Sequence, residues 1–524
     1  MLCRIYEVEY EISSHMLFQV KDLTIQEGDC IGLVGKNGSG KSTLLSLING
    51  DLEPTKGSIK RYSQVELLPQ IKPAQQGMSG GELTQEWLKD LFARESDLIL
   101  LDEPTTHLDY WRIEELERQL KAYKKPMVIV SHDRTFLNRL CNQIWEIDGK
   151  AVNEYQGNYD DYERQKLVEK QHHEKEYEKY LEQKQHLEQA IEQKEAKAAR
   201  ATKKPKNVSA SEAKITGAKP YFAKKQKKLN KGAKALKTRL EQLDPVEKIK
   251  ELPPIEMQLP NTEELGSKTL IRCEDLEGKA GDKALFYPTT FYIKFGERIA
   301  IIGENGSGKS TLIKNIMEQR EEVKHSPQLK IGYFDQQLKT LRSEKTIIDN
   351  VRETSIQDET LMRTILARLG FRREKVYKKV GVLSGGERVK VALAKIFVSD
   401  VNTLVLDEPT NFLDIEALEA LEGLLLEYPG TLIFVSHDRS FVNRLAKKLL
   451  IIENQQVHLF EGSLDEWQNS VPHASAVNNL EQELLVIENQ ISEVLGKLSL
   501  TPSEELEKEF DQLIKRKQAL KKMN

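Results

Sequence analysis

The stretch Gly35-Lys-Asn-Gly-Ser-Gly-Lys41-Ser42 occurs twice in this chain, because it returns 268 residues later as Gly303-Glu-Asn-Gly-Ser-Gly-Lys309-Ser310. Three further motifs also recur, each 305 residues after its first occurrence. They are Ser79-Gly-Gly-Glu82 with Ser384-Gly-Gly-Glu387, Asp102-Glu-Pro-Thr105 with Asp407-Glu-Pro-Thr410, and Ser131-His-Asp-Arg134 with Ser436-His-Asp-Arg439. Four motifs that return in one order indicate that a domain has been duplicated within the 524 residues.

The two copies differ in length between their first and second motifs. The offset increases there by 37 residues and then stays constant, so the first copy lacks a segment that the second copy has. In the second copy this segment includes 358–371, where apolar residues recur at the three-to-four spacing of a helix. We therefore expect only a short helical part in the first copy.

Short apolar runs precede the motifs in both copies. They are 31–34, 98–101 and 127–130 in the first copy and 299–302, 404–406 and 432–435 in the second. Because they alternate with helical stretches, they predict buried parallel strands of an α/β fold. Each motif then follows the carboxyl end of a strand, where ligands bind such sheets.

The Gly-x-x-x-x-Gly-Lys-Ser stretch between a strand and a helix is typical of the P-loop, whose backbone N–H groups surround phosphate oxygens. A chance glycine-rich turn is the alternative, and two copies in the same context argue against it. We expect Lys41 and Lys309 to reach the β- and γ-phosphates of a nucleotide, and Ser42 and Ser310 to bind Mg²⁺. The other expected contacts in the two loops are Gly35, Asn37, Gly38, Gly40, Thr43, Gly303, Asn305, Gly306, Gly308 and Thr311.

Paired acids end the second predicted strand of each copy. Asp102 and Asp407 suit a metal contact, and the adjoining Glu103 and Glu408 suit a base that activates water. A solvated strand end is the alternative for a single Asp-Glu pair, but the repetition after an apolar strand favours a site. His132 and His437, which follow the next strand, are the remaining catalytic candidates, although a lone histidine is usually structural.

Composition and the N-terminal residues indicate the cellular compartment in which the protein is expected. Charged residues make up 31% of the chain, and we find no apolar run near the roughly 18 residues that would suggest a membrane span. The N-terminal residues carry Glu7, Glu9 and Glu11 where a secretory signal would be basic and then apolar. The four cysteines form no CxxC pair, so a reducing cytosol is expected.

Together, the P-loop, Ser-Gly-Gly-Glu, Leu-Leu-Asp-Glu-Pro-Thr and Ser-His-Asp motifs resemble an ATP-binding-cassette (ABC) ATPase over about 400 residues. In that family each ATP site combines the P-loop of one cassette with the Ser-Gly-Gly signature of the other. The resemblance implies one site from Lys41, Ser42, Gln70, Asp102, Glu103 and His132 with Ser384, Gly385 and Gly386. It implies a second from Lys309, Ser310, Gln336, Asp407, Glu408 and His437 with Ser79, Gly80 and Gly81.

The resemblance also assigns further roles. Ser42, Gln70 and Asp102, and likewise Ser310, Gln336 and Asp407, would hold Mg²⁺, while Asp109 and Asp414 match the D-loop aspartates. The first signature departs from the pattern, because Leu-Thr-Gln follows Glu82 where the second copy has Arg388. Tyr10 is a candidate for stacking on adenine, and the second copy has no clear equivalent.

A charged linker joins the copies. It opens with Tyr155-Gln-Gly-Asn-Tyr159, and 159–202 predicts a helix of roughly 65 Å, with a second helix over 221–243 running back. Residues 197–239 carry a net charge of about +14 and the rest of the chain about −18. Such segregation favours contact with a polyanion such as rRNA or tRNA, and a solvated coiled-coil spacer is the alternative. The RNA-contact candidates are Lys203, Lys204, Lys206, Lys214, Lys219, Tyr221, Phe222, Lys224 and Lys225.

Two cassettes, this lead-in and the charged linker resemble the ABC-F family of translation factors. Several members of that family carry an arm insert in the first cassette, and the short spacing between Ser42 and Ser79 indicates that it is absent here. That absence, the long linker tip and the C-terminal extension resemble the antibiotic-resistance branch of the family, especially Vga-like proteins of Gram-positive bacteria. The resemblance implies a monomer that binds ATP, Mg²⁺ and the 70S ribosome at its E site, reaches 23S rRNA and P-site tRNA, and displaces lincosamides, streptogramins A and pleuromutilins. The expected domains are 1–156 and 265–470 for the cassettes, 157–250 for the linker, and 475–524 for a C-terminal coiled-coil extension.

Three other functions stay open at this point. A housekeeping ABC-F factor would bind ribosomes without conferring resistance. An exporter subunit would need a helical subdomain in both copies to dock on a membrane partner, and a DNA-repair ATPase would need a long coiled coil or zinc modules. The C-terminal extension is either a ribosome contact or a flap that packs on the second copy.

Overall fold

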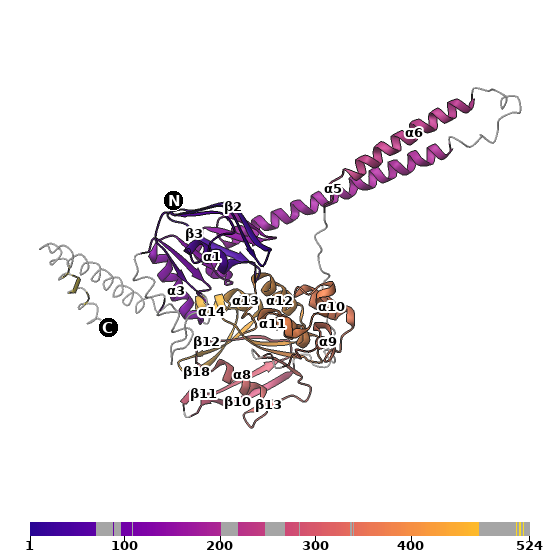
Figure 1. The fold of residues 1–524 in the computed structure, drawn as a ribbon. Coiled ribbons are helices and arrows are strands. Elements are labelled where there is room, and N and C mark those ends of the chain that lie inside the picture. The colour runs from indigo at the N-terminus through magenta and orange to yellow at the C-terminus, as the bar shows by residue number, and fades with distance from the viewer. Residues whose placement is uncertain are drawn as a thin grey trace.

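The computed structural model describes residues 1–69, 87, 96–106, 108–200, 218–246, 268–281, 283–335, 338, 340–470, 510, 513–514 and 517. Figure 1 shows two bodies in contact, one indigo to purple and one pink through orange to yellow, and a pair of long helices that projects away from both. The two bodies are the two copies of the repeat.

The first copy is built on a nine-stranded sheet in the order β4-β1-β2-β9-β8-β3-β7-β6-β5. Its strands are β1 (Cys3–Ile12), β2 (His15–Ile25), β3 (Cys30–Gly35), β4 (Lys56–Arg61), β5 (Val65–Leu68), β6 (Leu98–Asp102), β7 (Met127–Val130), β8 (Gln143–Asp148) and β9 (Ala151–Gln156). Its helices include α1 (Lys41–Asn49), α3 (Tyr110–Tyr123) and α4 (Arg134–Leu140). Strands β5, β6, β7, β3 and β8 are parallel neighbours, and β3, β6 and β7 are the three strands that were predicted.

The antiparallel part of this sheet was not predicted. Strands β1, β2 and β4 pair antiparallel and form no continuous apolar run, because exposed residues interrupt the buried ones in β1 and β2 and no residue of β4 is buried. By contrast β6 and β7 are buried at every position, with one apolar core on the side of α1 and another on the side of α3 and α4.

The second copy has two sheets, β11-β10-β13 and β14-β15-β16-β12-β17-β18. Their strands are β10 (Thr269–Ala280), β11 (Lys283–Lys294), β12 (Arg298–Gly303), β13 (Val323–His325), β14 (Ile331–Phe334), β15 (Thr403–Asp407), β16 (Thr431–Val435), β17 (Lys448–Glu453) and β18 (Gln456–Glu461). The helices are α8 (Lys309–Met317), α9 (Ile347–Arg352), α10 (Glu359–Arg368), α11 (Gly385–Phe397), α12 (Ile415–Glu427), α13 (Arg439–Leu445) and α14 (Leu464–Ser470), with 3₁₀ turns η2 (Arg373–Tyr377) and η3 (Val380–Val382).

The helix predicted within 358–371 is confirmed as α10. Asp358 caps it, because its side chain accepts a hydrogen bond from the Leu361 N–H at 2.7 Å. The corresponding part of the first copy, 70–86 and 88–95, lies outside the described residues. The prediction of a short helical part in the first copy therefore concerns residues that the structure does not describe.

The linker contains the two predicted helices. The first, α5 (Tyr159–Arg200), has 42 residues and spans roughly 63 Å, and α6 (Ala218–Glu241) runs back along it (Figure 1). Helix α6 begins three residues before the predicted start, since Pro220 is tolerated in a first turn. Ile191 and Ala233 are buried in the hairpin, and Lys237 pairs with Glu195 at 2.7 Å. The predicted C-terminal coiled coil falls almost wholly outside the described residues.

Candidate active sites between the two copies

Each glycine-rich stretch forms the turn from a buried strand into a helix, β3 into α1 and β12 into α8. The residue before each helix has a left-handed backbone, with φ of 102° at Gly40 and 106° at Gly308. A Cβ on Gly40 would lie 2.7 Å from side-chain atoms of Leu17 and Phe18, so glycine is required there. Among the described residues no side chain caps either helix, which leaves the first N–H groups available to an anion.

The two P-loop lysines lie buried behind these turns. The Lys41 ammonium donates hydrogen bonds to the carbonyls of Gly35 at 2.7 Å and Lys36 at 3.2 Å. Lys309 likewise donates to the carbonyls of Gly303 and Glu304, both at 2.9 Å. Burial lowers the pKa of both lysines, and the carboxylates near them oppose that shift. A buried cation of this kind favours a polyanionic ligand.

The first acid of each pair lies beside the P-loop serine. Asp102 and Asp407 end β6 and β15, and each accepts a hydrogen bond from the Ser42 or Ser310 hydroxyl at the start of α1 or α8. Burial raises the pKa of both carboxyls, and these hydrogen bonds oppose the shift. One hydroxyl and one carboxylate are oxygen ligands that Mg²⁺ accepts when phosphate oxygens supply further positions.

The second acid of each pair is buried in a strained backbone position. Glu103 and Glu408 both have φ of 51°, in the left-handed region that residues with a side chain occupy less often. Burial raises the pKa of Glu103 to about 8 and that of Glu408 to about 7. The Nε2 atoms of His132 and His437 lie 3.4 Å and 3.1 Å from the respective carboxylates.

The first histidine is neutral in this environment. Burial lowers the pKa of His132 to about 3, with Lys41 adding to the shift and Asp414 of the second copy opposing it. A histidine with so low a pKa stays neutral near pH 7, so His132 is suited to positioning the Glu103 carboxyl, whose raised pKa fits a base that acts near neutral pH.

Residues of the second copy complete the first site. The Asn37 N–H donates to Oδ2 of Asp414 at 2.9 Å, and its side-chain amide donates to the Phe412 carbonyl at 3.0 Å. A Cβ on Gly386 would lie 3.7 Å from Nδ2 of Asn37, so the signature lies next to this P-loop. Ser384 caps α11 in a reciprocal bond with Glu387, so a helix N-terminus also borders the site.

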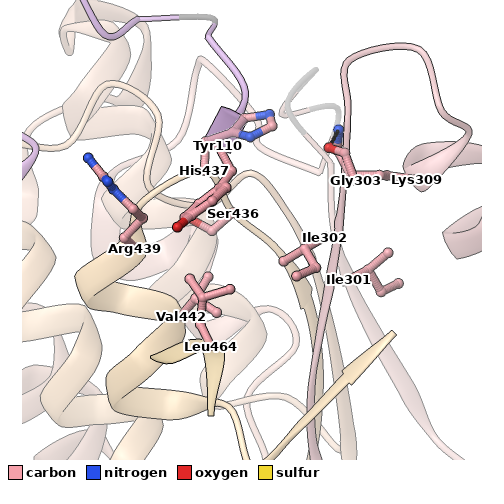
Figure 2. A pocket seen from close by; sticks show the side chains of 10 residues that line it. All are labelled: Tyr110, Ile301, Ile302, Gly303, Lys309, Ser436, His437, Arg439, Val442 and Leu464. Carbon is pink, nitrogen blue, oxygen red and sulfur yellow. Dashed lines mark hydrogen bonds between the residues drawn. The ribbon is translucent and has the colours of Figure 1, made fainter. Parts of the chain in front are cut away.

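The second site has the matching interaction. The N–H of Asn305 in the second P-loop donates to Oδ2 of Asp109 in the first copy at 2.9 Å. Figure 2 shows the region behind this P-loop, where Tyr110 of the first copy lies near His437 and where Gly303 and Lys309 form the opposite wall.

Several predicted residues fall outside the described part of the chain. These are Gln70, Ser79, Gly80, Gly81, Gln336, Lys203, Lys204, Lys206 and Lys214. Lys219, Tyr221, Phe222, Lys224 and Lys225 lie in the first two turns of α6, and Lys224 is exposed. The Tyr10 ring stacks on Phe18, at 6.2 Å between centroids, beside Gly40.

The prediction missed the ion pairs that join the two copies. Arg134 pairs with Glu422, and Arg439 pairs with Glu117, all four side chains being buried. The signal was present in the repeat, because Arg134 and Arg439 end the Ser-His-Asp-Arg motif and both glutamates keep the same offset of 305.

Because each P-loop contacts residues of the opposite copy, the fold and the site define a tandem ABC-type ATPase. A family profile described as "ABC transporter" matches residues 18–76 and 286–411, and a second one, also described as "ABC transporter", matches 145–212. The ribosome protection protein VmlR of Bacillus subtilis is 33% identical over 96% of this chain and 95% of its own length. The erythromycin resistance ATP-binding protein MsrA of Staphylococcus epidermidis is 32% identical over 86% of this chain and 99% of its own.

Solved structures share the arrangement of the fold. An archaeal ribosome recycling factor, crystallised with a ribosomal stalk protein, has a TM-score of 0.60 at 18% identity, covering 89% of this chain and 92% of its own. The chain belongs to the ABC-F family of ATPases, with similarity to its ribosome-protection branch. The helices that the structure describes include none with the length and apolar character needed to cross a bilayer.

Proposed function

We propose that this ATPase acts in the cytosol on the 70S ribosome, as a monomer whose two cassettes pair within one chain. It binds the E site, and its α5–α6 hairpin reaches 23S rRNA, P-site tRNA and the peptidyl transferase region. There it displaces antibiotics of the lincosamide, streptogramin A and pleuromutilin classes. The names of the two relatives, which refer to ribosome protection and erythromycin resistance, support this proposal.

One observation carries the proposal: the hairpin begins at the interface between the cassettes. Tyr159 and Tyr162 in the first turn of α5 pack into the core of the first cassette, and Ile415 of the second cassette packs against that same core. A change in the distance between the cassettes would therefore tilt α5, and a lever of roughly 63 Å magnifies a small rotation at its base.

In each site the residues take separate roles. Lys41 and Lys309 hold the β- and γ-phosphates of ATP, while Ser42 with Asp102 and Ser310 with Asp407 hold Mg²⁺, assisted by Gln70 and Gln336. The metal supplies neutralising charge at the phosphates. Glu103 and Glu408 orient the attacking water and accept its proton, and His132 and His437 hold these carboxylates in place. The signature residues close the site, so binding favours pairing of the cassettes and product release favours their separation.

The sharpest test separates binding from hydrolysis. With both Glu103→Gln and Glu408→Gln, the chain should remain with 70S ribosomes through a sucrose cushion when ATP is present, because closure no longer ends in hydrolysis. Lys41→Ala with Lys309→Ala should not, since the phosphates lose their cation. A double Gln variant that separates from ribosomes in saturating ATP would refute the proposal.

Resistance itself needs a cellular measurement. Expression in a susceptible Gram-positive host should raise the minimum inhibitory concentration of at least one of the three drug classes, with erythromycin included in the panel. If ribosome binding holds and no inhibitory concentration changes, the chain is a housekeeping ABC-F factor. An exporter subunit would instead be recovered with a membrane protein and would leave ribosomes unoccupied.

A further inference from the structure

A cluster of buried charges lies where the two cassettes meet. Helices α4 and α13 touch there, since Oγ1 of Thr135 and Oγ of Ser440 are 2.7 Å apart. These two residues occupy the same position in the repeat, 305 residues apart. Equivalent positions touch only at a symmetry axis, so the cluster surrounds the pseudo-twofold axis of the cassette pair.

Two ion pairs cross the interface at this axis. Arg134 of the first cassette binds Glu422 of the second, and Arg439 of the second binds Glu117 of the first. Glu422 is 0% exposed and Arg439 is 2% exposed. We call these four residues the closure latch. Buried charges of this kind are strongly unfavourable unless their partners are in place.

Each latch carboxylate also has an arginine from its own cassette. Arg444 lies 2.7 Å from Glu422, and Arg139 lies 3.0 Å from Glu117. Arg444 is 52% exposed, whereas its counterpart across the interface, Arg134, is 9% exposed. When the cassettes separate, each glutamate therefore keeps one partner and each latch arginine regains water. Because no glutamate or arginine is then left buried without a partner, the contact between the cassettes is reversible.

The latch lies beside the base of the linker. Arg134 is close enough to Tyr159 and Glu163, in the first turns of α5, to influence the pKa of both. Nδ2 of Asn138 in α4 donates to Oδ2 of Asp160 at 2.8 Å, and Oδ1 of Asn138 accepts from the Asp160 N–H at 3.0 Å. Helix α4 thus joins the latch to α5 on a single rigid element.

The second cassette repeats this arrangement at α14, the helix that follows its last strand. Asn443 of α13 is bonded to Asp465 of α14 at 2.8 Å and 3.0 Å. Trp467 of α14 then contacts Trp111 of the first cassette edge to face, at 6.5 Å between centroids. Figure 2 shows Arg439 near Tyr110 behind the second P-loop, and the guanidinium lies 5.6 Å from the Tyr110 ring centre. The latch therefore borders the second nucleotide site, the base of α5 and helix α14.

We propose that Arg134–Glu422 and Arg439–Glu117 form a reversible latch that holds the closed cassette pair and sets the direction of α5 in that state. Arg134 and Arg439 are positioning residues, because they act through α4 and α13 and touch no reacting atom. The inference rests on the proposed nucleotide-driven closure and assigns the contacts that convert closure into linker movement.

The test uses the full chain with spin labels at exposed Glu53 and Glu321, one in each cassette, and at Glu178 on α5, with the four native cysteines replaced. Distances are measured with and without a non-hydrolysable ATP analogue. Arg134→Met should reduce the closed fraction at saturating analogue about tenfold and leave α5 unshifted. Apparent analogue affinity should fall by a similar factor, because nucleotide binding and closure are thermodynamically linked.

Three comparisons make the result specific. Arg444→Met should leave the closed fraction within about twofold, because Arg444 pairs with Glu422 in both states. Arg134→Lys should recover part of the closure. Glu416→Gln removes an exposed ion pair with Lys36 across the same interface, at 2.9 Å, and should have little effect. Arg439→Met tests the symmetric half of the latch if Arg134→Met does not fold.

The outcomes separate the two ideas. If the unmodified sequence shows no distance change with the analogue, nucleotide-driven closure itself fails. If the unmodified sequence closes, and the Arg134→Met and Arg439→Met variants close equally well, the latch is wrong and the proposed function stands. Equal damage from Arg444→Met and Arg134→Met would mean a general packing role and would also overturn the latch.

Discussion

Asp109 in the first cassette accepts a hydrogen bond, at 2.9 Å, from the backbone N–H of Asn305 in the P-loop of the second. The same side chain caps α3, since its other oxygen accepts from the Arg112 N–H at 3.1 Å. One buried carboxylate therefore fixes the start of a helix in one cassette and the shape of the phosphate-binding turn in the other. Asp414 and Asn37 repeat the relationship at 2.9 Å.

Asp109→Ala should lower ATP turnover about tenfold, because a buried N–H in the opposite P-loop loses its acceptor and the turn loses its shape. Steady-state phosphate release, measured with and without ribosomes, is the readout. Asp109→Asn keeps one acceptor oxygen, which can serve one of the two hydrogen bonds, and should be less impaired than the alanine variant. A rate within twofold for the alanine variant would show that the cross-cassette bond is dispensable.

Lys41→Ala should weaken ATP binding at the first site at least about tenfold, since a charge-assisted contact to phosphate is lost. Titration with a fluorescent ATP analogue gives the affinity. The exposed Lys60→Ala removes the same charge from β4 and serves as the control. Equal affinity in the two variants would contradict the assignment of Lys41.

The stability of the nucleotide-free protein should fall as pH rises through the range set by the buried acids. Burial raises the pKa of Glu103 to about 8 and of Glu408 to about 7, above the unfolded value of about 4.3. The native state then binds more protons than the unfolded state between these values, so its free energy of unfolding decreases with pH. That contribution is complete below about pH 4.3 and is lost as pH passes 7 to 8.

The double variant Glu103→Gln, Glu408→Gln removes both titrations. Its Tm minus that of the unmodified protein should therefore increase from pH 6 to pH 9, by about 2–4 °C for each kcal/mol gained. The exposed Glu321→Gln should give a flat difference over the same range. A flat difference for the double variant would mean that these carboxyls titrate normally.

Ile191→Asp should unfold the hairpin without harming the ATP sites, because it places a carboxylate in the buried seam between α5 and α6. We expect a loss of helical circular dichroism at a lower temperature and a ribosome-free ATPase rate within twofold. Antibiotic protection should be lost. Gln185→Asp introduces the same residue at an exposed position of α5 and is the matched control.

Much of the site was predictable because its motifs are local. A P-loop requires consecutive glycines, one lysine and one serine at set spacing, and the acids and histidines directly follow apolar strands, so each half-site can be identified from a few neighbouring residues. The long helices of the linker were also predictable, since α5 contains no glycine or proline. The antiparallel strands β1, β2 and β4 were less evident, because partial burial leaves a weaker pattern than a continuous apolar run.

By itself the sequence determined the duplication, the two α/β cassettes, the chemistry of each half-site and the charge of the linker, because these depend on residue type and short-range spacing. Only the tertiary structure decided which half-sites meet, as in Asp109 with Asn305, and which buried charges pair across the axis, as in Arg134 with Glu422. Those contacts join residues 196 and 288 positions apart, so no local pattern specifies them. They exist because two similar surfaces pack around one pseudo-twofold axis.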